Sequence, residues 1–435
     1  MIINGDCKEE LKKYSDSYFH SCVTDPPYGI KFMNQKWDYS IPSVEIWKEI
    51  YRVLRPGGFV LCFCGTRTQH RMAVNIEDAG FHIRDVIAWI YGQGFPKSLD
   101  IGKAIDKQLG VYDKREIIGY MNAPGDTCFM QFDGKNTRPF LEKQKAENNG
   151  KPDMVKVTLP YSEEAKTWDG WGTSLKPAME LITVAQKPIE GTFANNIMKY
   201  DVGGLNIHGC LIELQSGESI PINKLEKWSG FGQIEQPYYE QVLNNEGRFP
   251  ANVILDKEAG AVLDIQSGSD TGAKAPVKAG NDGKSKGIYS DYKSKGDDGK
   301  SFYGDIGGAS RFFYCPKASR SERESGLENF DVLPAGSMNG RKDGSFGLKP
   351  IRRKNDHTTV KPIELMRYLC RLVTPIGGII LDPYFGTGST GCGAVMEMMD
   401  FVGIELETHN YEIAEARIKY WKRQSEYERS QMRLF

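Results

Sequence analysis

The chain has 435 residues, of which 40% are hydrophobic and 26% are charged, and its formal net charge at pH 7 is −1. A length of this order predicts two or three domains around a large buried core, and the nearly balanced charge excludes an overall electrostatic attraction to polyanions. No apolar run reaches the roughly 18 residues of a membrane span, and the first residues already follow a strand-like pattern. We therefore expect neither a membrane span nor a signal peptide.

Nine cysteines are scattered along the chain, and no two of them form a Cys-x-x-Cys pair. Cys62 and Cys64 alternate within an apolar run, so both are expected on one face of a strand, as small buried side chains rather than metal ligands. An odd number of cysteines in a globular chain is typical of a reducing compartment. These patterns predict a cytoplasmic protein without a metal site.

Strand-like and helix-like segments alternate in the N-terminal quarter of the chain. Apolar residues recur at helical spacing after Ser43, a residue type favoured as an N-cap, until Arg55-Pro56-Gly57-Gly58 interrupts them. The predicted elements are strands at 1–6 and 21–25 with a short amphipathic helix between them, a helix at 43–54, a strand at 59–64, a helix at 68–79 and a strand at 81–91. This alternation predicts an α/β fold with a doubly wound, mostly parallel sheet.

The most informative motif is Asp25-Pro26-Pro27-Tyr28, which follows the second predicted strand. It suits chemistry on an exocyclic NH2 group, which is a poor nucleophile because its lone pair is delocalised into a ring. Asp25 and the rigidly held carbonyl of Pro26 can each accept one N–H, and Tyr28 offers a flat face on which a base can stack. Taken alone, the same four residues also suit an ordinary turn.

A second motif lies near the C-terminus, where an apolar strand at 379–382 runs into a glycine-rich turn and a helix. The glycines follow G-x-G-x-x-G spacing, and the next strand, 401–405, ends in Glu405, an acid suited to a ribose hydroxyl. Asp382, however, would repel a pyrophosphate and favour a cationic ligand such as S-adenosylmethionine, which carries a sulfonium and an ammonium. A nicotinamide-dependent dehydrogenase, and a turn used only for packing, are the alternatives.

Together these motifs resemble those of the amino-methylating DNA methyltransferases. Residues 25–28 match the family's catalytic D-P-P-Y motif, and the stretch from Asp382 matches its cofactor motif of the D-P-F-x-G-x-G type, with Tyr384 in place of the phenylalanine. The segment 357–365 is similar to one that touches the methionine end of the cofactor, and the segment 2–7 to a strand that ends near its adenine. The order, with the catalytic motif first, resembles the β class.

The resemblance implies S-adenosyl-L-methionine as the cofactor and a defined set of site residues. The catalytic residues would be Asp25, Pro26, Pro27 and Tyr28. The cofactor-binding residues would be Asp6, Cys7, Thr359, Lys361, Asp382, Tyr384, Gly386, Thr387, Gly388, Ser389 and Glu405.

The order of the motifs along the chain also has a structural interpretation. If 379–382 is the first strand of the sheet and 401–405 the second, residues 1–6 supply the third and 21–25 the fourth. In a doubly wound sheet the first and fourth strands are neighbours at the switch point, where ligands bind. Asp382 and Asp25 are therefore expected at adjacent strand ends.

The remaining sequence is interpreted as inserts that recognise DNA. The predicted domain parts are 1–105, 172–208 and 350–435 for the catalytic domain, 106–171 for a first insert, and 209–349 for a target-recognition region with a flexible loop at 267–301. Basic residues cluster before the cofactor strand, which favours phosphate contacts. The residues expected to contact DNA are Trp37, Arg341, Lys342, Arg352, Arg353 and Lys354.

We interpret the chain as a site-specific methyltransferase acting on N6 of a flipped-out adenine in double-stranded DNA, bacterial or phage-encoded. A homodimer and a cognate restriction enzyme are partners that this interpretation allows. In the family, aspartate at position 25 favours adenine and serine favours N4 of cytosine, which is the nearest alternative. An RNA or protein-amide methyltransferase, and a non-catalytic nucleic-acid-binding protein on a relic methyltransferase fold, are the others. The sequence does not identify a recognition site.

Overall fold

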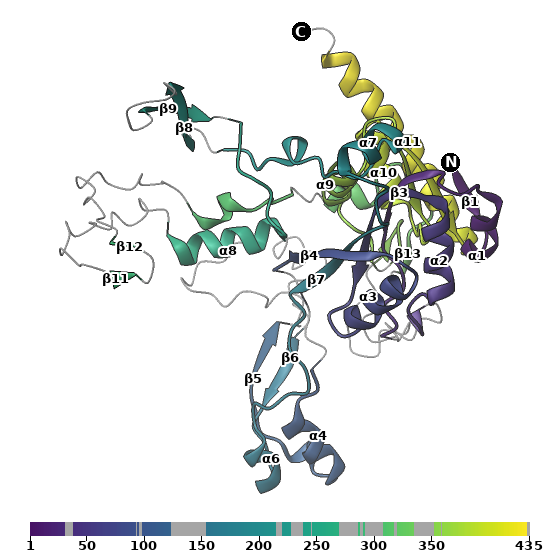
Figure 1. Ribbon diagram of the computed structural model, residues 1–435. Helices are drawn as coiled ribbons and strands as arrows, with labels where there is room; N and C mark the ends of the chain where they lie inside the picture. The colour runs from purple at the N-terminus through teal and green to yellow at the C-terminus, as the bar shows by residue number, and fades with distance from the viewer. Residues whose placement is uncertain are drawn as a thin grey trace. The chain divides into compact units, whose positions relative to one another are not determined.

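The structure is a computed structural model that describes residues 1–30, 38–92, 94, 98–122, 154–214, 220–227, 238–244, 246–268, 286–287, 290–291, 308–316, 320–334, 352–357 and 359–432. The chain forms two compact units, one of Met1–Asn206 with Lys317–Phe435 and one of Ile207–Pro316 (Figure 1). Trp37, Arg341 and Lys342 lie outside the described residues, as does most of the predicted loop 267–301.

The first unit is built on a mixed, mostly parallel sheet. Its strands lie in the order β1 (Ile2–Asn4), β16 (Asp400–Glu405), β15 (Ile379–Asp382), β2 (Phe19–Thr24), β3 (Leu54–Cys64), β7 (Met179–Gln186) and β4 (His82–Ile90). Neighbours from β1 to β3 are parallel, whereas β7 runs antiparallel to both β3 and β4. The predicted α/β fold with a mostly parallel sheet is confirmed, and the position of β7 is not anticipated by the sequence pattern.

Strands from the two ends of the chain lie side by side in this sheet. β15 pairs with β2, with Leu381 opposite Cys22, and β16 pairs with β1. Figure 1 shows this as purple N-terminal segments beside yellow C-terminal ones. The N-terminal ammonium of Met1 donates a hydrogen bond to the Phe401 carbonyl at 2.7 Å. The predicted order of the strands, with the first beside the fourth, is confirmed.

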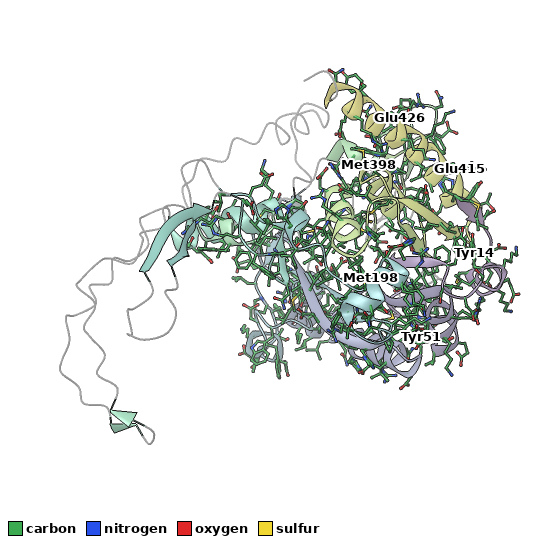
Figure 2. The ribbon with its side chains drawn as sticks, turned by 45° about the horizontal axis from the view of Figure 1, so that its top comes forward. Tyr14, Tyr51, Met198, Met398, Glu415 and Glu426 are labelled. Carbon is green, nitrogen blue, oxygen red and sulfur yellow. The ribbon has the colours of Figure 1, made fainter. Side chains whose placement is uncertain are left out.

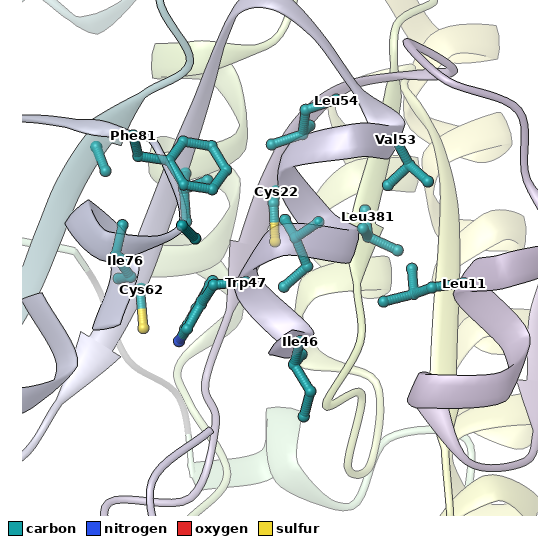
Figure 3. Packing of buried hydrophobic residues seen from close by; sticks show 14 of the residues in the cluster. Leu11, Cys22, Ile46, Trp47, Val53, Leu54, Cys62, Ile76, Phe81 and Leu381 are labelled. Atoms are coloured by element: carbon teal, nitrogen blue, oxygen red, sulfur yellow. The ribbon is translucent and has the colours of Figure 1, made fainter. Parts of the chain in front are cut away.

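Helices cover both faces of the sheet. α1 (Cys7–Glu10), α2 (Val44–Val53) and α3 (Gln69–Asp78) pack on one face, and α9 (Ile363–Val373), α10 (Ser389–Met396) and α11 (Thr408–Met432) pack on the other. On the first face, Trp47 of α2 lies in one buried cluster with Cys22 and Leu381 (Figure 3). Burial on both faces explains the continuous apolar runs at 59–64 in β3 and 379–381 in β15. Away from the sheet, α11 carries the exposed Glu415 and Glu426 (Figure 2).

The two cysteines of β3 are both buried, with their Sγ atoms 3.9 Å apart. This agrees with the alternation that predicts Cys62 and Cys64 on one face. Within the described part of the chain, no group of histidine, cysteine and acidic side chains is arranged to hold a metal ion. No described helix is both long enough and apolar enough to cross a bilayer.

The other elements complete the two units. The first unit also contains α4 (Ile101–Gln108), β5 (Ile117–Asn122), β6 (Met154–Thr158), α6 (Glu163–Thr167), α7 (Phe193–Tyr200), β13 (Leu333–Pro334) and β14 (Arg352–Arg353). The second unit contains β8 (Ile220–Lys227), β9 (Tyr238–Asn244), β10 (Val253–Leu255), α8 (Lys257–Ser267), β11 (Lys286–Gly287) and β12 (Ser290–Asp291).

Candidate active site

Four acidic residues stand at the carboxyl ends of neighbouring parallel strands. Asp6 and Asp25 follow β1 and β2 closely, while Asp382 and Glu405 are the last residues of β15 and β16. Parallel strands end at the same edge of a sheet, which is where ligands bind in folds of this kind. All four residues line one cavity of about 1720 Å³, and every residue lining this cavity belongs to the first unit.

The glycine-rich turn after β15 shapes one wall of the cavity. Gly386 and Gly388 have left-handed φ angles of 51° and 80°, which residues with a Cβ rarely adopt. The Gly386 N–H donates a hydrogen bond to Glu405 Oε2 at 2.7 Å, and Gly388 is the N-cap of α10. Burial raises the pKa of Glu405. The turn therefore fixes the Glu405 carboxylate in the cavity wall.

An aromatic stack holds this turn against the sheet. The ring of Phe385 stacks on Phe401, with the centroids 5.4 Å apart. A Cβ added to Gly403 of β16 would lie 2.3 Å from the Phe385 ring. Glycine at 403 therefore makes the room that lets the Phe385 ring pack beside β16.

Asp382 is almost fully buried and is held by three hydrogen bonds. Its Oδ1 accepts from the Thr24 hydroxyl at 2.7 Å and from the Tyr384 N–H at 3.1 Å, and its Oδ2 accepts from the Thr390 hydroxyl at 2.6 Å. Burial is the largest influence and raises the pKa of Asp382 to about 6, although the hydrogen bonds act in the opposite direction. Thr24 and Thr390 are not predicted from the sequence, because a threonine in a strand or a helix is not by itself a site signal.

All but one of the residues predicted to bind the cofactor line the same cavity. Asp6 caps α1 by accepting from the Lys8 N–H at 2.9 Å, and burial raises the pKa of the Cys7 thiol to about 11. The Thr387 hydroxyl accepts from the Asn355 amide at 3.2 Å. Gly388 does not line the cavity, whereas the predicted residues that do are Asp6, Cys7, Thr359, Lys361, Asp382, Tyr384, Gly386, Thr387, Ser389 and Glu405.

The catalytic motif meets a buried lysine and a second carboxylate. Asp25 accepts from the Tyr28 hydroxyl at 2.8 Å through Oδ1 and from the Lys361 ammonium through Oδ2. Glu180 of β7 lies 3.3 Å from Lys361 Nζ and accepts from the Tyr28 hydroxyl at 3.0 Å. Burial acts to lower the pKa of Lys361, but Asp25 and Glu180 outweigh it, so that pKa is raised. Burial also raises the pKa of Tyr28 well above its usual value, so its hydroxyl remains a donor.

Three contacts in and beside this cluster were not predicted from the sequence. The resemblance assigns Lys361 to the cofactor, and the structure places its ammonium on Asp25. Glu180 is not predicted, because nothing in its local sequence marks a functional site. Asp38 is fully buried, and its Oδ1 accepts from the N–H groups of Tyr28 at 2.6 Å and Gly29 at 2.9 Å. Asp38 therefore fixes the turn that carries the catalytic motif.

The residues predicted to contact DNA have different surroundings. Arg353 lines the cavity. Arg352 pairs with Pro334 in the two-stranded ladder of β13 and β14. The Lys354 ammonium donates a hydrogen bond to the Glu328 carbonyl at 2.7 Å. Contact of these residues with DNA stays a prediction.

Removal of the buried lysine provides a test of the cluster. We expect Lys361→Met to lower the free energy of unfolding by about 3–5 kcal/mol, because the carboxylates of Asp25 and Glu180, which are 19% and 23% exposed, would lose their cation. Urea denaturation measures this change. Lys12→Met is the matched control, since the side chains of Lys12 and its partner Glu9 are 59% and 67% exposed, and such a pair contributes about 1 kcal/mol or less. If the two variants lost equal free energies of unfolding, Lys361 would not be the cation that stabilises Asp25 and Glu180.

The cavity suits S-adenosyl-L-methionine, the cofactor that the resemblance implies. Asp382, which ends β15 beside the glycine turn, would repel the pyrophosphate of a dinucleotide, whereas Glu405 at the end of β16 also suits the ribose of a dinucleotide. The same carboxylates suit ribose hydroxyls and a sulfonium or ammonium group, because an ionised carboxylate only accepts hydrogen bonds. The side chains present therefore fit this cofactor better than a nicotinamide dinucleotide.

Comparison with known proteins agrees with this chemistry. A family model described as DNA methylase, N6_N4_Mtase, matches residues 19–416. The chain is 22% identical over 251 residues to the type II methyltransferase M.HindIII of Haemophilus influenzae, a match that covers 47% of this chain and 64% of that protein. It is 31% identical over 109 residues to the type II methyltransferase M.Cfr9I of Citrobacter freundii, covering 25% and 33%. The chain thus spans less than two thirds of the length of each of these relatives.

Among solved structures, M1.HpyAVI matches with 12% identity and a TM-score of 0.36, over 96% of this chain and 98% of that one. The family model covers most of the sequence, including the catalytic and cofactor motifs. The chain therefore belongs to the N6_N4_Mtase family of DNA methylases, with S-adenosyl-L-methionine as its cofactor.

Proposed function

We propose that the chain methylates the exocyclic N6 of an adenine in double-stranded DNA, and that it is a β-class member of its family. One observation carries the proposal: two motifs from opposite ends of the chain meet, with Asp25 and Asp382 at the ends of paired strands and on one cavity. A methyl donor held at Asp382 and an amine held at Asp25 would be neighbours there. Aspartate rather than serine at position 25 supports adenine as the base.

The chain's residues would act mainly by positioning the reacting groups. When bound, the cofactor supplies an electrophilic methyl group on its sulfonium. Asp25 and the Pro26 carbonyl would each accept one N–H of the target amine, which directs the nitrogen lone pair at the methyl group. The flipped-out base would stack on Tyr28, supported by Pro27. The amine loses its proton late, after methylation makes that proton acidic, so Asp25 need not be a strong base.

The hydrogen bonds around Asp25 indicate how the amine would enter. Its Oδ1 accepts from the Tyr28 hydroxyl, and that hydroxyl has Glu180 as a second acceptor at 3.0 Å. An entering amine would take the place of Tyr28 at Oδ1, and the single hydroxyl proton of Tyr28 would then be donated to Glu180. Lys361 would stay on Oδ2 and hold the carboxylate in its orientation.

The proposed biological role rests on the names of the relatives. Both curated relatives are named type II methyltransferases, which supports a role in restriction and modification, in the cytoplasm of a bacterium or encoded by a phage. Double-stranded DNA is the proposed substrate, and residues 209–349, which contain most of the second unit, are the proposed target-recognition region. A cognate restriction enzyme and a second copy of the chain are the proposed protein partners.

The reaction is tested by nucleoside mass spectrometry. Unmethylated genomic DNA would be incubated with the purified protein and S-adenosyl-L-methionine and then digested to nucleosides. We expect N6-methyladenine. N4-methylcytosine would keep the mechanism and change the base, because that base presents the same kind of NH2 group. No methylated nucleoside from DNA or from RNA would overturn the proposal in favour of a relic nucleic-acid-binding protein.

A further inference from the structure

The loop that precedes β7 forms part of the rim of the cavity. Residues 173–178 all line it. Leu175, at the middle of this loop, is 91% exposed, which is the highest value among the large hydrophobic side chains of the described residues. Single exposed apolar side chains are common on protein surfaces, so exposure alone assigns no role to Leu175. Its position on the rim of the catalytic cavity is what distinguishes it.

The main chain on both sides of Leu175 is held in place. On one side, the Ser98 hydroxyl oxygen accepts from the N–H groups of Thr173 at 2.9 Å and Ser174 at 3.3 Å. A Cβ at Gly172 would lie 2.2 Å from that oxygen, so glycine lets the loop close on Ser98. These contacts fix the start of the loop.

The other side of the loop is fixed in a similar way. The Lys176 ammonium donates to the Gly92 carbonyl at 2.6 Å, and the Tyr91 N–H donates to the Ala178 carbonyl at 2.9 Å. Leu175 thus projects from a loop whose two ends are tied to the segment after β4. Leaving an apolar side chain in water forgoes the free energy of burying it, and the hydrogen bonds on both sides hold the backbone around Leu175 in place.

A short stretch of chain connects Leu175 to the catalytic cluster. Glu180, five residues further on, contacts Tyr28 and Lys361 at the side of Asp25. Five extended residues span at most about 18 Å. Both Leu175 and Glu180 line the same cavity. A short segment of the chain therefore connects the rim of the cavity to the residues around Asp25.

We propose that Leu175 is a wedge that enters the DNA base stack and fills the space left by the flipped-out target base. This inference rests on the proposed function, since it requires a target nucleotide at Asp25. Flipping removes the stacking and pairing of one nucleotide, and inserted leucines are known to stabilise unstacked base steps. A leucine on the rim would cover the exposed faces of the neighbouring bases while the target base lies in the cavity at Asp25. Leu175 is then a positioning residue that acts on the duplex and does not touch the reacting amine.

The test compares two duplexes that carry the methylation site, which is first mapped by single-molecule sequencing of DNA methylated by the wild-type protein. In the first, the target base is paired; in the second, it lies opposite an abasic position, so that little pairing remains to be broken. We expect Leu175→Ala to lower kcat/KM on the paired duplex by about 10- to 100-fold, which corresponds to a few kcal/mol of unstacking. The same variant should stay within about threefold of wild type on the abasic duplex, because most of the flipping cost is already absent.

Two further variants separate a wedge from a structural role. Leu175→Met keeps an apolar side chain of similar size and should restore most of the activity on the paired duplex. Ile376→Ala is the matched control, because Ile376 is 74% exposed and does not line the cavity; it should leave both rates unchanged.

Two outcomes with Leu175→Ala would overturn the wedge: equal losses on the two duplexes, or no loss on either. Both leave wild-type methylation intact, so they are distinguishable from failure of the proposed function. If the wild-type protein methylates neither duplex, the proposed function fails and the wedge fails with it.

Discussion

Asp25→Ala is expected to lower the rate of methyl transfer by about 10³-fold or more and to leave S-adenosyl-L-methionine binding within about twofold. The loss combines a misplaced amine with the removal of its acceptor, and effects of positioning and proton handling of this kind reach 10²–10⁴-fold. Asp25 lines the cavity just after β2, whereas the glycine turn follows β15 and Glu405 ends β16. Tritium transfer to DNA measures the rate, and titration calorimetry measures cofactor binding.

Asp78→Ala is the control for this variant. Asp78 is exposed at the last residue of α3 and does not line the cavity, so its loss should leave the rate unchanged. If Asp25→Ala kept more than about a tenth of the wild-type rate, Asp25 would not be the residue that holds the amine. If the rate and the cofactor affinity fell together, Asp25 would instead support the cofactor site.

Asp382→Ala is expected to weaken S-adenosyl-L-methionine binding by about 30-fold or more, measured by titration calorimetry. A buried carboxylate facing a cationic group typically contributes about 2–5 kcal/mol when one partner is removed, and each 1.4 kcal/mol is about tenfold in Kd. Asp400→Ala is the control, because Asp400 is exposed at the opposite end of β16. Unchanged affinity in Asp382→Ala, with the variant shown to be folded by its urea denaturation, would remove Asp382 from the cofactor site.

The pH dependence of cofactor binding gives an independent test of Asp382. Its pKa in the unliganded protein is about 6, and a cationic ligand favours the ionised carboxylate. The Kd of the wild-type protein should therefore rise as the pH falls below about 6, by up to tenfold per pH unit. Asp382→Ala should lose this dependence. For the unliganded fold the sign is reversed: a raised pKa stabilises the fold at acid pH, and that contribution is lost as the pH rises through about 6.

Much of the sheet and its strand order follows from local sequence. Continuous apolar runs at 59–64 and 379–382 predict strands buried on both faces, and the structure places β3 and β15 there. The neighbouring positions of β15 and β2 follow from the motif order and the rule for doubly wound sheets, and their pairing is confirmed. The antiparallel direction of β7 was not predicted, because the direction of a strand in a sheet depends on its partners and not on its own sequence pattern.

The sequence by itself identified the residues with distinctive chemistry: Asp25, Tyr28, Asp382 and the glycine turn, each of which sits in a local motif. It also predicted Asp25 and Asp382 at adjacent strand ends, although 357 positions separate them by the printed numbering. Only the tertiary structure decided which groups surround them. Lys361 pairs with Asp25 from 336 residues away, Glu180 joins from β7, and Leu175 stands on the rim. Local patterns report neighbours along one helix or strand, whereas charge balance and exposure are set by elements that meet only when the chain is folded.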